Sequence, residues 1–232
     1  MGEAYLHVCN CSPAIQPGSN NGMIPYGTPQ WLDWAREIHA LAKTSQHYAA
    51  NEFERQRAER LLGIAGEIIH RHTGIETDRI RAAFDAQSGY VTPKVDVRAA
   101  VFDQERLLLV QEALDGGWTL PGGWADVGDR PSQAIEREVL EEAGLKVTCQ
   151  RLIGVYDANR VSGQLALFHA YKLIFLCEML GGTLRPSLET TAAAFFSRDE
   201  LPEPLSARRT TPRHIQDAFR FFDDPSRPAV ID

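Results

Sequence analysis

Residues 120–145 read LPGGWADVGDRPSQAIEREVLEEAGL, and this stretch decides the fold of the larger part of the chain. Gly122 and Gly123 precede a polar turn, and helical periodicity then runs over residues 131–143. The glycine pair would let the backbone approach a phosphate group, which a side chain would hinder. Gly144 is expected to have a structural role, because glycine readily adopts the left-handed conformation that ends a helix. The pattern therefore predicts a glycine-rich loop that leads into a helix.

Three glutamates of that helix are expected to share one face. Glu138, Glu141 and Glu142 stand at i, i+3 and i+4, which places them within an arc of roughly 100°. Like charges in this arrangement repel, and a cation among them would remove the repulsion. Carboxylate oxygens favour a hard ion such as Mg²⁺ or Mn²⁺. A solvated glutamate face is the alternative that these three residues alone leave open.

The whole stretch closely resembles the Nudix box, Gly-x5-Glu-x7-Arg-Glu-U-x-Glu-Glu-x-Gly-U, in which U is an aliphatic residue. Eight of the nine specified positions match, and the exception is Asp129, where the family has glutamate. The matching residues are Gly123, Arg137, Glu138, Val139, Glu141, Glu142, Gly144 and Leu145. A match of this extent excludes the solvated-face alternative for the segment as a whole.

The resemblance implies that water attacks a phosphorus atom of a diphosphate, while Mg²⁺ or Mn²⁺ neutralises the charge that builds on the oxygens. It assigns metal binding to the three glutamates. The family takes its general base from a box glutamate, here Glu138, or from a carboxylate on a later loop, here Glu189. It also implies that Asp129 and Arg137 pair and brace the loop against the helix, so both are expected to be structural.

Residues 28–90 show helical periodicity and form a predicted domain of their own. Thr28 is a candidate N-cap with Pro29 at the first helical position, and further helices are expected near residues 51–70 and 77–86. One face of the first helix carries Trp31, Trp34, Ile38 and Leu41. Aromatic residues at this spacing are more often a packing surface, here against a second subunit or the next domain, than a ligand platform. A homodimer is therefore expected.

Residues 91–232 are predicted to form the hydrolase domain. Alternating apolar residues indicate a strand at 95–101, and residues 107–111 are predicted to return as a second strand, so that the two form a hairpin. After the glutamate helix come further predicted strands near 146–156, 166–178 and 192–196 and a last helix near 212–222. The fold class is therefore α+β. The family resemblance implies an α/β/α sandwich with a mixed sheet, preceded by the small all-helical domain.

Segments outside the box extend the resemblance to about residues 31–222. The runs PKVDVRAAVF, WTLPGGWADVGD and FHAYKLIFLCE look like the Nudix subgroup that has its own helical N-terminal domain. Members of that subgroup hydrolyse ADP-ribose or other nucleoside diphosphates joined to a second group, CDP-choline among them. The residues expected to face such a substrate are Arg98, Trp118, Gly122, Gly123, Tyr156 and His169. For Arg98 a paired arginine, and for Trp118, Tyr156 and His169 an interior position, are the alternatives.

Two other functions share these sequence features. The chain could hydrolyse free nucleoside triphosphates with the same metal chemistry. It could also be a binding protein that senses a metabolite through the same fold, although a sensor has no need to hold three mutually repelling glutamates.

Composition narrows the choice of partners and compartment. With 24 Lys and Arg against 31 Asp and Glu, the chain has a formal charge of −7, whereas a nucleic-acid binder normally carries a basic face. The sequence contains no run of about 20 apolar residues, so no membrane span is predicted. The four cysteines lack the spacing of a disulfide framework, which favours the cytoplasm: Cys9, Cys11, Cys149 and Cys177. Residues 1–27 read as a disordered tail, and Met23 is a candidate alternative start.

Overall fold

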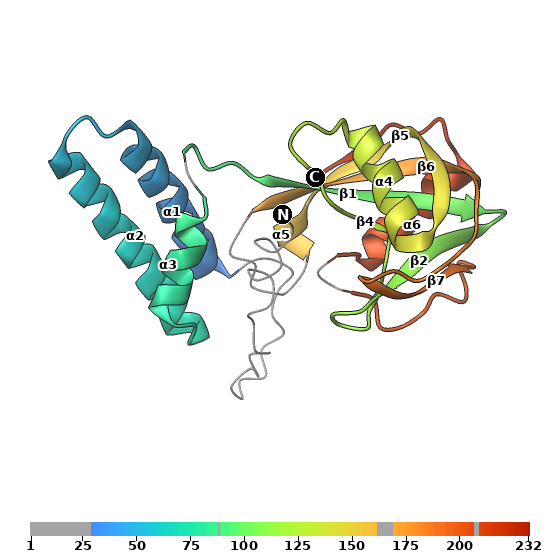
Figure 1. Ribbon diagram of the computed structural model, residues 1–232, viewed down its shortest axis with the longest axis horizontal. Coiled ribbons are helices and arrows are strands. Elements are labelled where there is room, and N and C mark those ends of the chain that lie inside the picture. The colour runs from blue at the N-terminus through green and yellow to red at the C-terminus, as the bar shows by residue number, and fades with distance from the viewer. Residues whose placement is uncertain (1–28, 88, 162–168, 207–208) are drawn as a thin grey trace. The chain divides into compact units, whose positions relative to one another are not determined.

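The computed structural model describes residues 29–87, 89–161, 169–206 and 209–232. The chain divides into two compact units between Thr92 and Pro93. Figure 1 labels the helices of the first unit and the sheet of the second. The predicted disordered tail, residues 1–27, lies outside the described residues, as do Cys9, Cys11 and Met23.

Residues 29–87 of the first unit form three helices. They are α1 (Gln30–Tyr48), α2 (Glu52–Thr73) and α3 (Thr77–Asp85). The side chain of Asn51 accepts a hydrogen bond from the Glu54 amide at 3.0 Å and so caps the first turn of α2. Gly74 ends α2 with a φ of 70°, in the left-handed region that suits glycine. Pro29 precedes α1 and is not its first residue, and the predicted cap Thr28 lies outside the described residues.

The interior of this unit is lined by a different face of α1 from the aromatic one. Buried residues of α1 include Ala35, His39 and Ala42, whereas Trp34 is 56% exposed and Leu41 is 61% exposed. Small side chains let α1 approach its neighbour closely, which large ones would prevent. The stripe that contains Trp34 and Leu41 therefore faces outward from this unit.

The second unit is built on a mixed sheet of eight strands. Its path runs in the order β3-β2-β1-β6-β5-β8, with β4 beside β1 and β7 beside β2. The strands are β1 (Lys94–Asp103), β2 (Arg106–Glu112), β3 (Trp118–Thr119), β4 (Gly122–Trp124), β5 (Leu145–Asp157), β6 (Ala170–Gly182), β7 (Thr190–Phe196) and β8 (Val230–Ile231).

The strand pairing explains how the first half of β1 comes to lie beside the glycine pair. β1 and β2 form the predicted antiparallel hairpin, and β1 also runs parallel to β6 along most of its length. β4 pairs with the first half of β1, where Arg98 lies opposite Gly122 and Val97 opposite Gly123. β5 pairs antiparallel with β6 and parallel with the short β8.

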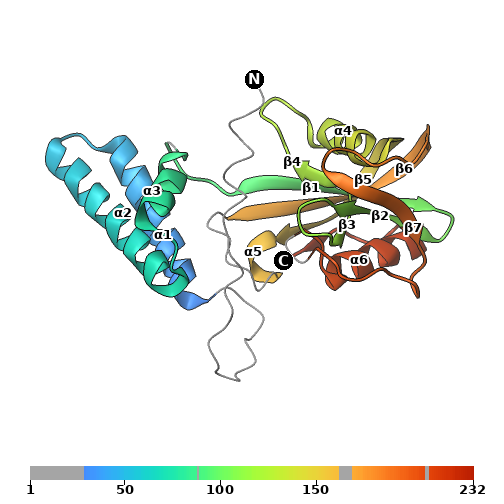
Figure 2. The same ribbon diagram turned by 60° about the horizontal axis from the view of Figure 1, so that its bottom comes forward.

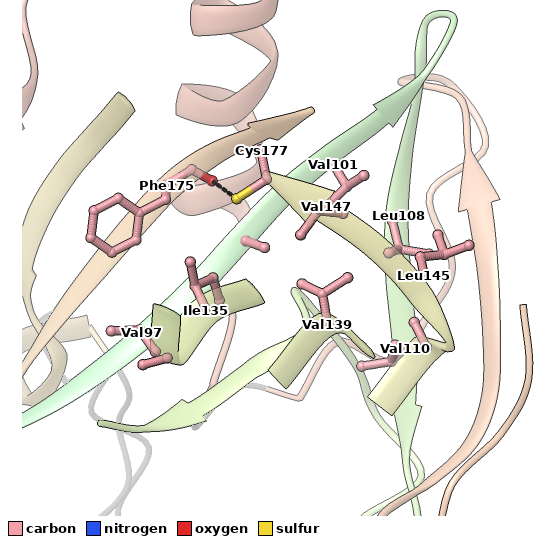
Figure 3. Close-up of a cluster of buried hydrophobic side chains, with 13 residues drawn as sticks. Val97, Val101, Leu108, Val110, Ile135, Val139, Leu145, Val147, Phe175 and Cys177 are labelled. Carbon is pink, nitrogen blue, oxygen red and sulfur yellow. Dashed lines mark hydrogen bonds between the residues drawn. The ribbon is translucent and has the colours of Figure 1, made fainter. Parts of the chain in front are cut away.

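Helices cover both faces of this sheet. They are α4 (Pro131–Ala143) on one face and α6 (Pro212–Asp223) on the other, as Figure 2 shows, and a short turn of helix, α5 (Ala158–Val161), follows β5. On the α4 side, Ile135 and Val139 pack against Val97, Ala99 and Val101 of β1 (Figure 3). The core on the α6 side gathers aromatic and aliphatic residues of α6 with β2 and β6. The predicted fold class is confirmed, with helix 131–143 found at the predicted residues.

One predicted strand begins later than expected within the described residues. The strand predicted near 166–178 is observed as β6, Ala170–Gly182, and part of the predicted range lies outside the described residues. In the part of the chain that the structure describes, no helix is long and apolar enough to cross a membrane.

Candidate active site

A side chain at Gly122 or at Gly123 would meet a different neighbour in each case. Gly122 has a φ of 140°, and a Cβ there would collide with the carbonyl oxygen of Val97. A Cβ on Gly123 would lie 3.0 Å from Oε2 of Glu138. The loop therefore packs against β1 on one side and against a carboxylate of α4 on the other.

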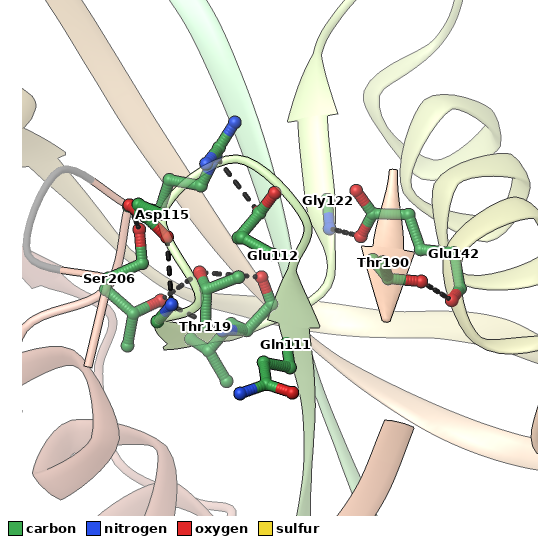
Figure 4. Close-up of polar contacts among 12 residues, drawn as sticks. Gln111, Glu112, Asp115, Thr119, Gly122, Glu142, Thr190 and Ser206 are labelled. Carbon is green, nitrogen blue, oxygen red and sulfur yellow. Dashed lines mark hydrogen bonds and ion pairs between the residues drawn. The ribbon is translucent and has the colours of Figure 1, made fainter. Parts of the chain in front are cut away.

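The three glutamates of α4 occupy three different environments. Glu142 is 5% exposed, and its Oε2 accepts a hydrogen bond from the amide of Gly122 at 2.8 Å (Figure 4). Burial raises the pKa of Glu142 to about 8, although the charge of Arg98 opposes the shift. Glu138 has a side chain that is 13% exposed, and burial raises its pKa as well. The side chain of Glu141 is 59% exposed.

Arg137 lies among four carboxylates. Its Nη2 is 3.1 Å from Oδ2 of Asp129, the predicted partner, and 3.4 Å from Oδ2 of Asp126. Its Nη1 is 2.9 Å from Oε1 of Glu138 and 3.3 Å from Oε2 of Glu141. The guanidinium thus joins the loop to the helix and also supplies positive charge between two of the three glutamates. The sequence prediction anticipated only the contact with Asp129.

The donor set suits a hard divalent cation. Among the described residues, no group of three or more His, Cys, Asp or Glu side chains is arranged to hold a metal ion. Burial raises the pKa of the neighbouring Glu138 and Glu142 carboxylates, which is the direction expected where buried negative charge lacks compensating positive charge. A cation coordinated by these oxygens would provide that compensation, so the residues fit a metal of the Mg²⁺ type.

Arg98 is buried and paired. Its Nε and Nη2 donate to Oδ1 and Oδ2 of Asp96, at 2.8 Å and 3.1 Å, and its Nη1 donates to the carbonyl of Leu120 at 3.1 Å. Lys172, on β6, donates to the same Asp96 at 3.1 Å. Burial lowers the pKa of Lys172 to about 8, with Asp96 opposing the shift. Of the two readings that the sequence left open for Arg98, the geometry matches the paired arginine.

Glu189 lies beside the C-terminal end of α4. It precedes β7, is exposed, and its carbonyl accepts a hydrogen bond from Ala113. The next residue, Thr190, is buried and donates through its hydroxyl to the carbonyl of Glu142 at 2.7 Å (Figure 4). This contact brings the segment that carries Glu189 next to Glu142.

The loop before α6 supplies further polar groups to this region. Arg209 Nε lies 3.0 Å from Oε1 of Glu112, a buried carboxylate at the end of β2 whose pKa is raised by burial. Ser206 donates to Asp115 at 2.8 Å (Figure 4). Glu112 and the glycine loop are therefore tied to a segment more than ninety residues away in sequence, since Thr119 and Thr210 also share a hydrogen bond of 2.8 Å.

The other residues predicted to face substrate are Trp118, Tyr156 and His169. Trp118 packs edge-on against Phe196, with ring centroids 4.9 Å apart. Tyr156 is fully buried, and its hydroxyl donates to Asp217 at 3.1 Å. Tyr156 therefore has the interior position that the sequence left as the alternative. His169 is partly exposed, with Nε2 3.2 Å from Oδ1 of Asp157.

Several residues of this region were missed by sequence reasoning. Five of them are buried polar residues: Asp96, Glu112, Lys172, Thr190 and Thr210. The sixth, Arg209, is partly exposed and pairs with the buried Glu112. A usable signal was the interruption of apolar strands by charge, as Asp96 and Lys172 interrupt β1 and β6. Thr190, Arg209 and Thr210 lie in segments without periodicity, and their roles follow only from long-range contacts.

Two family models match this chain. Residues 92–217 match the model described as the NUDIX domain, and residues 29–84 match the model described as a UDP-X-like, N-terminal oligomerisation domain. YjhB of Bacillus subtilis (strain 168), to which an ADP-ribose pyrophosphatase activity is provisionally ascribed, is 34% identical over 203 residues. That match covers 88% of this chain and 97% of YjhB.

Two solved structures resemble the chain. The crystal structure of an ADP-ribose pyrophosphatase from Streptococcus suis 89-1591 has 38% sequence identity and a TM-score of 0.55, and the match covers 61% of this chain and 100% of that one. The crystal structure of a UDP-X diphosphatase has 29% identity and a TM-score of 0.57, with 89% of this chain and 100% of that one covered.

Proposed function

Because the chain belongs to the Nudix family of pyrophosphohydrolases, we propose that it hydrolyses the pyrophosphate linkage of a nucleoside diphosphate joined to a second group. The products are a nucleoside monophosphate and the phosphorylated second group. The names of the similar proteins, ADP-ribose pyrophosphatase and UDP-X diphosphatase, support this class of substrate. ADP-ribose and CDP-choline are the substrate types that we propose first.

One observation supports the proposal most directly. The buried carboxylate of Glu142 is held by the amide of Gly122, at the point where the backbone is free of side chains. Glu138 lies against the adjacent Gly123. A diphosphate bound beside this part of α4 would therefore lie next to two buried carboxylates, and a divalent cation between them would compensate the negative charge of both groups.

The proposed roles follow from these positions. Glu138, Glu141 and Glu142 hold the metal, and Gly122 and Gly123 admit the phosphates. When bound, Mg²⁺ or Mn²⁺ neutralises the charge that develops on the phosphate oxygens. The carboxylate of Glu138 or of Glu189 accepts the proton of the attacking water, which adds as hydroxide to phosphorus while the bridging oxygen leaves. Asp129 and Arg137 hold the loop against α4, and Gly144 ends the helix.

Product analysis tests this function. The full chain would be incubated with Mg²⁺ and with ADP-ribose, CDP-choline, a UDP-sugar or a nucleoside triphosphate, and the products identified by chromatography. We expect a nucleoside monophosphate from at least one of the first three compounds. Pyrophosphate release from triphosphates alone would instead support the triphosphatase alternative. Binding without turnover of any compound would support the sensor.

We also propose that the chain forms a homodimer through the first unit. The model matched by residues 29–84 is described as an oligomerisation domain. In that unit large apolar side chains are exposed, among them Trp34, Leu41, Tyr48 and Phe53. Exposed apolar surface of this kind is typical of a protein interface. Twice the chain mass in light scattering at micromolar concentration would agree with a dimer, and a single chain mass would contradict it.

The proposed compartment is the cytoplasm. Cys149 and Cys177 are free thiols in the structure, which agrees with a reducing environment. Fractionation of the native host cell would test this assignment.

A further inference from the structure

The backbone of residues 120–122 is held at four polar groups by four distant partners. The amide of Leu120 donates to the hydroxyl of Thr210 at 2.9 Å, and the carbonyl of Leu120 accepts from Arg98 at 3.1 Å. The carbonyl of Pro121 accepts from the amide of Ala99 at 2.9 Å. The amide of Gly122 donates to Glu142 at 2.8 Å. The Gly122 amide that bonds Glu142 therefore belongs to a backbone segment that is held in place on both sides.

Arg98 is itself held by a buried ionic group. Asp96 accepts from Arg98 through both carboxylate oxygens, which fixes the plane of the guanidinium. Lys172 lies beside Asp96 in the parallel pairing of β1 and β6 and donates to Oδ2 at 3.1 Å. Arg98 and Lys172 are almost fully buried, and Asp96 is more than nine-tenths buried. The guanidinium has no freedom to leave this position while Asp96 is charged.

The three charges of this group sum to +1, because one carboxylate faces two cations. The excess positive charge lies directly behind the glycine loop, since Arg98 is opposite Gly122 in the β1–β4 pairing. It lies on the β1 side of the glycine loop, whose Gly122 amide holds Glu142. A buried ion group that only stabilised the fold would not need to contact residues 120–122. Arg98 of this group does contact them, through the carbonyl of Leu120, and the Gly122 amide in turn holds Glu142.

We propose that Asp96, Lys172 and Thr210 are positioning residues for the hydrolytic site. Asp96 and Lys172 fix Arg98, Arg98 and Thr210 fix the two sides of Leu120, and the fixed backbone aims the Gly122 amide at Glu142. This inference rests on the proposed function for the identity of Glu142 as a metal ligand. The chain of contacts itself is present in the structure.

Metal binding without substrate tests the proposal. The affinity for Mn²⁺ would be measured by electron paramagnetic resonance on the full chain, at a temperature well below the unfolding of every variant. For Asp96→Asn we expect the Mn²⁺ dissociation constant to rise about 10-fold, the lower end of the range for loss of a group bonded directly to a metal ligand. The lower end applies because Arg98 and residues 120–122 lie between Asp96 and Glu142. Lys172→Met is also expected to raise the Mn²⁺ dissociation constant. In both variants kcat should fall, while the KM for the nucleotide changes little.

Two conservative substitutions at Thr210 test the proposal without changing a buried charge, in case Asp96→Asn or Lys172→Met does not fold. Thr210→Val removes the hydroxyl but keeps the shape, and Thr210→Ser keeps the hydroxyl. We expect weaker Mn²⁺ binding and a lower kcat in the valine variant, and near wild-type values for both in the serine variant. A merely structural role would lower the melting temperature without separating the two variants in Mn²⁺ affinity.

Lys43→Met provides the matched control. Lys43 makes an ion pair with Asp85 at 3.0 Å in the first unit, so its loss should lower stability and leave Mn²⁺ affinity unchanged. Mn²⁺ affinities within twofold of wild type for folded Asp96→Asn and Thr210→Val would overturn the proposal. Failure of the proposed function would look different: the wild type would bind Mn²⁺ but cleave no nucleoside diphosphate derivative, and the positioning role would stand.

Discussion

At the residue scale, α4 carries three glutamate carboxylates whose surroundings differ. Glu142 is buried and bonded to a backbone amide, Glu138 is mostly buried beside Gly123, and Glu141 is largely exposed. Burial raises the pKa of Glu142 and of Glu138, because removing water penalises the charged form. We therefore expect the first two carboxylates to matter more to function than Glu141.

Glu138→Gln should abolish turnover at saturating Mg²⁺. The substitution keeps size but removes the charge that holds the metal or accepts the proton, so kcat is expected to fall by at least about 100-fold. Steady-state kinetics on the best substrate would measure the loss. Glu136→Gln is the control, because Gln can still accept the 2.8 Å hydrogen bond from the Cys149 amide. Near-normal rates in Glu138→Gln would exclude Glu138 as both ligand and base.

Asp129→Glu should retain or improve activity. Asp129 already reaches Arg137 at 3.1 Å on a largely exposed surface, and a side chain one methylene longer can make the same contact. The measurement is kcat/KM of the variant relative to wild type, with Asp129→Ala as the comparison that lacks the contact. A loss of tenfold or more in Asp129→Glu would show that the loop requires the shorter side chain.

At the element scale, Gly122 of β4 is constrained both by its backbone angle and by the packing of β1, whereas Gly128 in the following turn is constrained by its backbone angle alone. Gly122 combines a φ of 140° with the contact to the Val97 carbonyl, whereas Gly128 has a φ of 101° with open space around its Cα. Gly128→Ala should therefore cost only backbone strain, about 1–2 kcal/mol. Gly122→Ala should cost at least about 3 kcal/mol, because β1 and β4 must separate. Chemical denaturation would measure both losses, and equal losses would contradict the steric argument.

The packing of α1 against α3 should make stability depend on pH. His39 stacks on Phe84 with ring centroids 4.0 Å apart, and burial, followed by the charge of Lys43, lowers its pKa from 6.5 to about 4, with Asp85 opposing. The unfolded chain then binds a proton between about pH 6.5 and 4 that the folded chain does not. Folding stability is therefore complete above that window and falls as the pH is lowered through it.

Thermal unfolding at pH 7.5 and pH 5.5 would measure this effect. We expect a smaller fall in melting temperature for His39→Leu than for wild type, because leucine does not titrate. Buried His214, whose pKa burial lowers to about 3, should account for part of the fall that remains. Identical falls in the two proteins would show that His39 does not contribute.

At the scale of the whole molecule, charge placed on the exposed apolar face of the first unit should weaken self-association. Trp34→Glu combined with Leu41→Glu puts two carboxylates on side chains that are 56% and 61% exposed. The folded unit loses little, but a buried interface would have to accept unpaired charges. Light scattering should then show a shift toward the single chain mass. Leu114→Glu, exposed on the second unit, is the control and should leave the mass unchanged.

The sequence by itself determined the family, the fold class and the helix that carries the carboxylates. Spacing of 3.6 residues per turn fixes which side chains of residues 131–143 share a face, and the ends of that helix are encoded by Pro131 and Gly144. The alternation at 95–101 and the apolar run at 107–111 likewise predict the hairpin of β1 and β2, because only a short turn separates them. Such patterns are local, so no knowledge of the rest of the chain is needed to read them.

Only the tertiary structure decided how the polar residues are used. Tyr156 and Trp118 could face a ligand or the core, and which applies depends on α6 and β7, far away in sequence. The pairing of Lys172 with Asp96 depends on the register of β6 on β1, and the contact of Thr210 with Leu120 spans 90 residues. Burial and hydrogen bonding of a polar group are set by whatever packs around it, and for this site that comes from four separate segments of the chain.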